Sequence, residues 1–75
     1  EIGVLALDPS GHLLVGPSAE SAGALYDRRR EEGVGSFGGS VPLRHAVWSP
    51  DGQMLYGVDN MGLGWRWTRE ELLSP

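Results

Sequence analysis

The segment VLALDPSGHLLVG at residues 4–16 returns 41 positions later as HAVWSPDGQMLYG at residues 45–57. In both copies an apolar run leads into four residues with proline second and glycine last, and another apolar run follows. Proline presets φ at about −65° and glycine accepts a positive φ, so these four residues are typical of a tight turn. Each copy therefore predicts a β-hairpin.

The similarity between the copies extends beyond the hairpin. At an offset of 41 residues, six of the 34 aligned pairs are identical, and four of these six lie inside the hairpin. The identical pairs are Pro9/Pro50, Gly11/Gly52, Leu14/Leu55, Gly16/Gly57, Gly23/Gly64 and Arg28/Arg69. A repeat of roughly 40–45 residues is the length of one four-stranded propeller blade. We therefore predict two related structural units, residues 1–39 and residues 40–75.

The pattern along the chain predicts seven short strands. They are expected at residues 2–7, 13–16, 23–27 and 34–37 in the first unit, and at 43–48, 54–58 and 63–68 in the second. Residues 17–22 are expected to form a loop and residues 28–32 a charged, exposed connection. Residues 69–73 are expected to form either one helical turn or a bend, since the segment is too short to be helical alone.

The strands do not alternate between apolar and polar residues. Residues 4–7 read VLAL and residues 46–48 read AVW, so apolar side chains occupy consecutive positions. A sheet with one solvated face shows alternation, whereas a strand covered on both faces does not. The sequence therefore predicts inner strands that are covered on both sides. Trp48 is expected in the core, and Trp65 and Trp67 are expected either to pack on the preceding unit or to form a partner-binding patch.

Composition limits the classes of protein. Seventy-five residues form at most one small domain, with a core that supplies roughly 3–5 kcal/mol. The chain has no cysteine, which excludes a disulfide framework and Cys-based metal sites and favours an intracellular location, cytoplasmic or nuclear. A net charge of −4 argues against nucleic acid or anionic membrane as a partner. The apolar runs are too short to span a bilayer, and we expect no leader segment.

The residues that carry chemistry do not form a recognisable catalytic pattern. His12 and His45 each lie alone, without the spacing of a metal site. The serines lie outside any Gly-x-Ser-x-Gly elbow, and the glycine-rich residues 33–39 lack the lysine of a phosphate loop. The arginines at residues 28–30 are followed by Glu31 and Glu32, which favours a solvated loop. We therefore expect no catalytic residue, no metal, no cofactor and no enzymatic activity.

A set of short motifs resembles the WD-repeat family of β-propellers. Ser49-Pro50-Asp51-Gly52 matches the turn of that family, and the aromatic–acid pair Tyr26-Asp27 stands where the family has Trp-Asp. Gly38, eleven residues before Ser49, stands at the position of the Gly-His glycine. The chain departs from the family at Gly39, where histidine is usual, at Thr68, where aspartate is usual, and in a turn at residues 59–62 that is one residue longer.

The resemblance implies an all-β fold, a fragment of about one and three-quarter four-stranded antiparallel blades. Residues 1–39 would supply strands a–d of the first blade, and residues 40–75 strands a–c of a second, incomplete blade with a short tail. A complete ring needs roughly 4–8 blades, so the remaining blades would come from another segment or from other copies. The exposed strand edges and blade faces predict that the isolated chain is unfolded or associated.

The function implied by the resemblance is a non-catalytic scaffold for protein–protein interaction. Its partners would be proteins, including the remaining blades, and they would meet the face formed by the d–a and b–c connections. This face would carry Gly39, Ser40, Val41, Ala19, Glu20, Ser21, Asp59, Asn60 and Met61. The partner-binding residues are predicted to be Ser40, Asp59, Asn60 and Met61. Two alternatives stay open: a Tol-like or NHL-like propeller domain appended to an enzyme, and a structural fragment that assembles with copies of itself.

Overall fold

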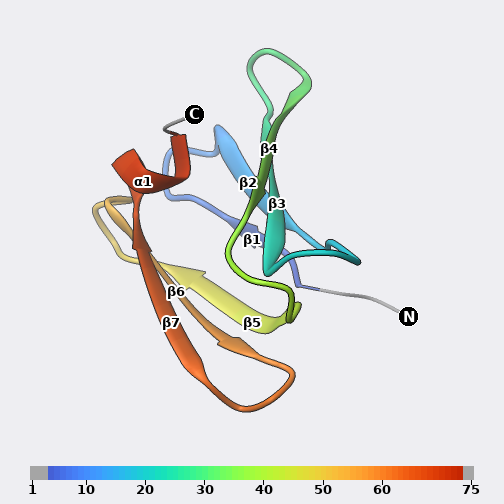
Figure 1. Cartoon of the computed structure of the whole chain (residues 1–75). Helices are drawn as coiled ribbons and strands as arrows, with labels where there is room; N and C mark the ends of the chain where they lie inside the picture. Colours follow the sequence, from blue (N-terminus) through green and yellow to red (C-terminus); the bar gives the residue numbers. More distant parts are fainter. Residues whose placement is uncertain (1–3, 74–75) are drawn as a thin grey trace.

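Two antiparallel β-sheets, followed by one short helix, make up the computed structural model, which describes residues 4–73 (Figure 1). In spatial order the first sheet contains β1 (Ala6–Leu7), β2 (Leu13–Gly16), β3 (Gly23–Asp27) and β4 (Glu32–Phe37). The second sheet contains β5 (Leu43–Trp48), β6 (Met54–Asp59) and β7 (Gly64–Thr68), and α1 (Arg69–Leu73) follows it. The predicted division into a four-stranded and a three-stranded antiparallel sheet is confirmed.

The two predicted tight turns join β1 to β2 and β5 to β6. The Gly11 N–H donates to the Asp8 carbonyl and the Gly52 N–H donates to the Ser49 carbonyl, each at 2.9 Å. Both glycines adopt a positive φ, 78° at Gly11 and 73° at Gly52, which a residue with a Cβ adopts only at a cost. The backbone freedom of glycine is thus used at the same place in both copies.

The sequence repeat is also a repeat of strand register. In the first sheet Leu14 lies opposite Leu7 on one side and Tyr26 on the other. In the second sheet Leu55, which is 41 residues later, lies opposite Trp48 and Trp67, the residues at the corresponding offset. The two sheets are therefore built on one plan in their first three strands.

The first strand is shorter than predicted. Of the predicted residues 2–7, the first two lie outside the described residues, and among the rest only Ala6–Leu7 pair as a strand. The neighbouring strand β2 ends at Gly16, because Pro17 has no N–H to continue the ladder. In the second copy Val58 takes the place of proline, and β6 continues to Asp59. The proline that follows the partner strand thus limits β1.

Two further boundaries differ from the prediction. Glu32 and Gly33, expected outside the strand, belong to β4, because Glu31 adopts a φ of 55° that closes the turn and lets Glu32 pair with Asp27. The last strand begins at Gly64 and not at residue 63. The other boundaries are confirmed within one residue.

The C-terminal segment is helical. The Glu71 N–H donates to the Thr68 hydroxyl at 3.0 Å, and the Thr68 N–H donates to the Glu71 carboxylate at 2.8 Å. This reciprocal pair is a capping box, which satisfies backbone donors at the start of a helix. Leu72 is buried, so the helix also contributes to the core. The helical alternative for residues 69–73 is therefore confirmed.

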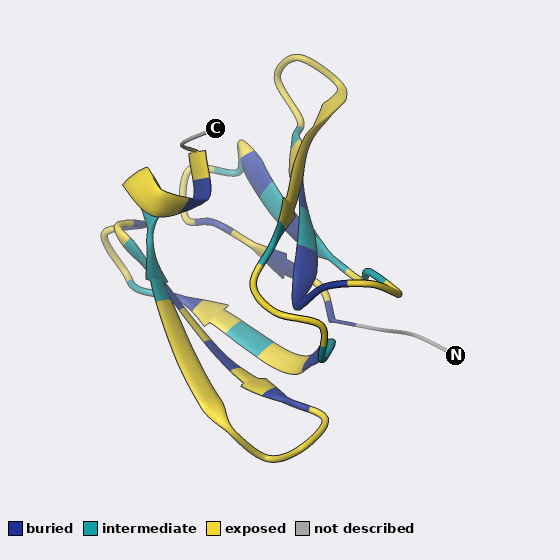
Figure 2. Cartoon of the chain, viewed as in Figure 1, coloured by how far each residue is buried: buried dark blue, intermediate teal, exposed yellow. Residues whose placement is uncertain are grey.

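The core lies between the two sheets, where β1 runs beside β5 (Figure 2). The first sheet covers it with a row formed by Ala6, Val15 and Leu25, which share one face because they are cross-strand neighbours. The second sheet contributes the row Trp48, Leu55 and Trp67. The Trp48 indole N–H donates to the Ala6 carbonyl at 3.1 Å and joins the sheets directly.

The opposite face of each sheet is open, although the sequence predicts strands covered on both sides. We call the row Leu7, Leu14 and Tyr26 the first free face; the side chain of Leu7 is 48% exposed and that of Tyr26 39%. The second free face consists of His45, Val47, Tyr56, Val58 and Arg66. Val47 is 62% exposed and Tyr56 44%. Consecutive apolar residues thus supply the core on one side and an uncovered apolar surface on the other.

One ion pair crosses between the sheets at the turn end. The Arg69 guanidinium donates to the Asp8 carboxylate at 3.0 Å, and the carboxylate is 1% exposed. Burial by itself would raise the pKa of Asp8. Hydrogen bonds from the Leu13 N–H, the Ser10 hydroxyl and the Arg69 guanidinium outweigh burial and hold the pKa well below its usual range. The charged carboxylate therefore stabilises the contact between the two sheets.

Replacing the Asp8 carboxylate is expected to make the free energy of unfolding depend less on pH in the acid range. Because the pKa of Asp8 is lowered in the folded state, its contribution is complete above the unfolded pKa of about 3.9 and is lost as pH falls through and below that value. We expect Asp8→Asn to lower the free energy of unfolding by about 2 kcal/mol at pH 7. Urea titrations from pH 7 to pH 2.5 should show this difference shrinking. An unchanged difference at pH 2.5 would contradict the assignment, and Glu20→Gln, an exposed carboxylate, is the control.

Candidate functional site

Three connections come together at the end of the sheets opposite the two tight turns. The Ala22 N–H donates to the Phe37 carbonyl at 3.0 Å, and the Leu43 N–H donates to the Ala22 carbonyl at 2.8 Å. The Asn60 N–H donates to the Pro42 carbonyl at 3.0 Å. These bonds join residues 17–22, 38–42 and 59–63 into one surface, which we call the loop cluster. The connections predicted to form a partner-binding face are thus neighbours.

Asp59 shapes the β6–β7 turn from inside. Its side chain is 1% exposed, and its carboxylate accepts from the Met61 N–H at 2.8 Å, the Leu63 N–H at 3.0 Å and the Trp65 indole at 2.8 Å. The hydrogen bond from Trp65 is the main cause that lowers the pKa of Asp59; burial opposes it, and the turn N–H groups add to it. The Asp59 carboxylate therefore uses its hydrogen bonds within and next to the β6–β7 turn, where it positions Asn60 and Met61.

The other three predicted binding residues lie at the surface. Met61 is 73% exposed, and Asn60 and Ser40 are also exposed. Asn60 and Met61 follow directly on the buried Asp59, and Gly62 closes their turn with a φ of 85°. The turn therefore presents one amide side chain and one flexible apolar side chain, a combination that suits contact with a peptide.

An aromatic row borders the loop cluster. The Phe37 and Trp67 rings meet edge to face with centroids 4.9 Å apart, and Trp65 stacks on Trp67 at 6.2 Å. Trp67 packs against the core, whereas Trp65 is 45% exposed. Of the two predicted roles, packing applies to Trp67. Trp65 keeps an exposed ring, and its indole N–H is held by Asp59.

Ser21 holds the β2–β3 connection, residues 17–22, through two hydrogen bonds. Its hydroxyl is buried and donates to the Gly23 carbonyl at 3.0 Å, and it also bonds the Ser18 hydroxyl at 2.8 Å. Ala19 and Glu20 lie between these residues and are exposed. Every buried side-chain nitrogen or oxygen in residues 4–73 has a hydrogen-bond partner. The loop cluster is therefore held by satisfied polar contacts.

The other residues considered for chemistry lie apart from one another. His12 follows the first tight turn, and His45 stands on the second free face. Arg30 lies 3.9 Å from both Asp27 and Glu32 in an exposed turn. Across residues 4–73 no three side chains of His, Asp or Glu gather in a way that would hold a metal ion. In the same part of the chain no helix is long and apolar enough to cross a membrane.

Comparison with models of protein families gives no match for this chain, and comparison with curated proteins gives none either.

Proposed function

We propose that the chain is a non-catalytic scaffold for protein–protein interaction, a part of a β-propeller of the WD-repeat type. Residues 1–39 would be its first blade and residues 40–75 its second. The observation that carries this proposal is the repeated sheet: two antiparallel sheets share one strand register at an offset of 41 residues and pack face to face. Stacked units of one plan are the way in which repeat proteins bury their cores.

The loop cluster is the proposed partner-binding surface. Asn60, Met61 and Ser40 would contact the partner, and Asp59 would hold the turn that carries two of them. The exposed ring of Trp65 borders this surface, and tryptophan is enriched among residues that dominate binding energy. An extended peptide with an apolar side chain for Met61 and a hydrogen-bonding group for Asn60 is the partner that this surface suits.

Removing the two exposed turn side chains is expected to weaken peptide binding. Peptides would be selected from a random library against the immobilised chain, and their affinity measured by fluorescence polarisation. We expect Asn60→Ala/Met61→Ala to weaken binding about tenfold or more, because contact residues at such sites each contribute upwards of about 1 kcal/mol. The free energy of unfolding should change little, since both side chains are exposed.

The matched control is Arg29→Ala, an exposed change in the β3–β4 turn at the other end of the sheets. It should bind the selected peptides as the natural chain does. Selection that returns no binder, or binders whose affinity is the same for Asn60→Ala/Met61→Ala, would contradict the proposed surface.

A second candidate function, self-assembly into a larger stack, is favoured by a separate observation. Both free faces expose large apolar side chains, Leu7 on the first and Val47 on the second, although each belongs to a sheet whose other face is packed.

A further inference from the structure

The two sheets do not contact each other through equivalent faces. The first sheet contributes Ala6, Val15 and Leu25 to the core, and the residues 41 positions later are Val47, Tyr56 and Arg66, which lie on the second free face. The second sheet contributes Trp48, Leu55 and Trp67. The residues 41 positions earlier are Leu7, Leu14 and Tyr26, the first free face.

The contact inside the chain is therefore head-to-tail. The face that carries Ala6, Val15 and Leu25 on the first sheet meets the face that carries Trp48, Leu55 and Trp67 on the second sheet, and these two faces are not equivalent in the repeat. Each free face is the counterpart of the face that is already packed on the other sheet. A head-to-tail contact leaves an unused face of each kind at the two ends of the stack.

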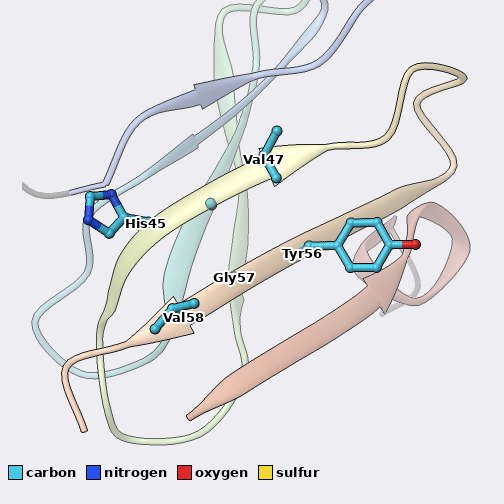
Figure 3. A pocket seen from close by; sticks show the side chains of 6 residues that line it. His45, Val47, Tyr56, Gly57 and Val58 are labelled. Carbon is cyan, nitrogen blue, oxygen red and sulfur yellow. The ribbon is translucent and has the colours of Figure 1, made fainter. Parts of the chain in front are cut away.

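We propose that the second free face binds the first free face of another copy of this chain, in a repetition of the contact between its own two sheets. The second free face has a shallow pocket of about 190 Å³ between β5 and β6. The pocket is lined by His45, Val47, Tyr56 and Val58 and by the backbone of the two strands (Figure 3). Leu7 and Leu14 of the second copy would cover this pocket, as Trp48 and Leu55 cover Ala6 and Val15 within one chain.

The charges at the turn end fit the same arrangement. Inside the chain, Arg69 donates to the Gly52 carbonyl of its own unit and to Asp8 of the preceding unit. Arg28, which is 41 residues earlier, donates in the same way to the Gly11 carbonyl. Stacking would bring Arg28 of the second copy to the Ser49–Gly52 turn, where the Asp51 carboxylate is exposed.

One position on the second free face departs from its counterpart. Arg66 stands where the first sheet has the buried Leu25. A charged side chain buried inside an apolar contact weakens it, since desolvation of the charge opposes association. Copies of the chain should therefore associate reversibly, and Arg66→Leu should tighten association by about tenfold or more, the effect of burying one leucine side chain.

The inference rests on that part of the proposed function which makes the chain a segment of a stack of repeat units. It does not depend on the loop cluster, which lies on a different surface. Unchanged peptide binding in Asn60→Ala/Met61→Ala, with association of the natural chain intact, would mean that the loop-cluster proposal has failed. A natural chain that stays monomeric, with peptide binding still weakened in that variant, would mean that the stacking proposal has failed.

The test uses two variants, each with one face blocked by charge. Val47→Glu blocks the second free face and leaves the first intact; Leu7→Glu does the opposite. By sedimentation equilibrium the natural chain should form a concentration-dependent series of oligomers, and each variant alone should be monomeric. An equimolar mixture of the two variants should form a dimer with one copy of each, because one intact face of each kind remains. Arg29→Ala, which changes the net charge by the same single unit, should associate like the natural chain.

Cross-linking gives a second measurement that does not need a charged residue in a sheet. The natural chain has no cysteine, so a short bis-maleimide reagent would join only introduced thiols. A mixture of Leu7→Cys and Val47→Cys should cross-link, and Val47→Cys alone should not. A natural chain that is monomeric at all concentrations, a mixture of the glutamate variants that stays monomeric, or a cross-link in Val47→Cys alone would each overturn the proposal.

Discussion

Trp48→Ala is expected to unfold the chain. Trp48 is 7% exposed in the centre of the sheet-to-sheet core, and its indole N–H donates to the Ala6 carbonyl on the other sheet. Truncation of a buried tryptophan costs about 3–5 kcal/mol, and a core of this size supplies roughly the same net stability. Far-ultraviolet circular dichroism and amide exchange should therefore show loss of both sheets together, since within residues 4–73 the two sheets share one core.

Two further variants serve as controls. One removes chiefly the hydrogen bond of Trp48, and the other removes an apolar side chain that is exposed. Trp48→Phe keeps most of the packing and removes the N–H donor, so it should cost about 1–2 kcal/mol and leave the chain folded. Met61→Ala removes a large apolar side chain that is 73% exposed and should change the free energy of unfolding by less than about 0.5 kcal/mol. A Trp48→Ala chain with native circular dichroism and native exchange protection would contradict the position of the core.

Gly38→Ala is the second change with a large expected effect. Gly38 has a φ of 82°, which residues with a Cβ rarely adopt, and a Cβ placed there would overlap the Cβ of Ala22 and lie 3.2 Å from the Trp67 ring. The backbone strain costs about 1–2 kcal/mol and the overpacking about 1–3 kcal/mol. We expect the free energy of unfolding, measured by urea titration, to fall by about 3 kcal/mol.

The neighbouring glycine is the matched control. A Cβ on Gly39 would meet no atom within 4 Å, so Gly39→Ala should be close to neutral. The double variant Gly38→Ala/Ala22→Gly removes the overlap but not the backbone strain, and it should recover only part of the lost stability. Equal stability of Gly38→Ala and Gly39→Ala would show that the connection between the sheets packs differently.

Much of the architecture could be predicted because local signals agree with one another. The Asp8–Gly11 and Ser49–Gly52 turns carry proline and glycine where the backbone needs them, and they fix the hairpins. The boundaries that were wrong depend on partners that a local pattern does not contain. β1 is short because Pro17 ends the strand beside it, and β4 is long because of the backbone at Glu31.

The loop cluster could be predicted in part. In a sheet of antiparallel neighbours, alternate connections lie at the same end, so the grouping of Ser40 with Asn60 and Met61 follows from strand order. Strand order does not reveal that Asp59 is buried whereas Asn60 and Met61 are exposed. The position of Asp59 depends on three N–H groups that donate to its carboxylate. An acid two residues after a buried strand position and six before a tryptophan is too common a pattern to reveal this.

Exposed sheet faces were expected for a fragment of a larger set of blades, but the sequence does not say which residues form them. Consecutive apolar residues predict coverage on both sides, but a sequence pattern does not say what supplies the cover. The described residues supply it on one side only, and Leu7 and Val47 remain largely exposed. Alignment of the two copies at an offset of 41 residues shows which free face corresponds to which packed face. The sequence repeat therefore contains the correspondence between the faces. The burial of each residue is needed to identify which face is packed and which is free.

The packing of β1 against β5 is the claim on which the core, the repeat and the proposed stacking all depend. A nuclear Overhauser spectrum of the labelled chain tests it most directly, through the indole N–H of Trp48. We predict cross-peaks from this proton to Ala6, together with slow exchange, because it donates to the Ala6 carbonyl at 3.1 Å. An indole N–H that exchanges as fast as that of a free peptide, with cross-peaks only to β6, would contradict the account.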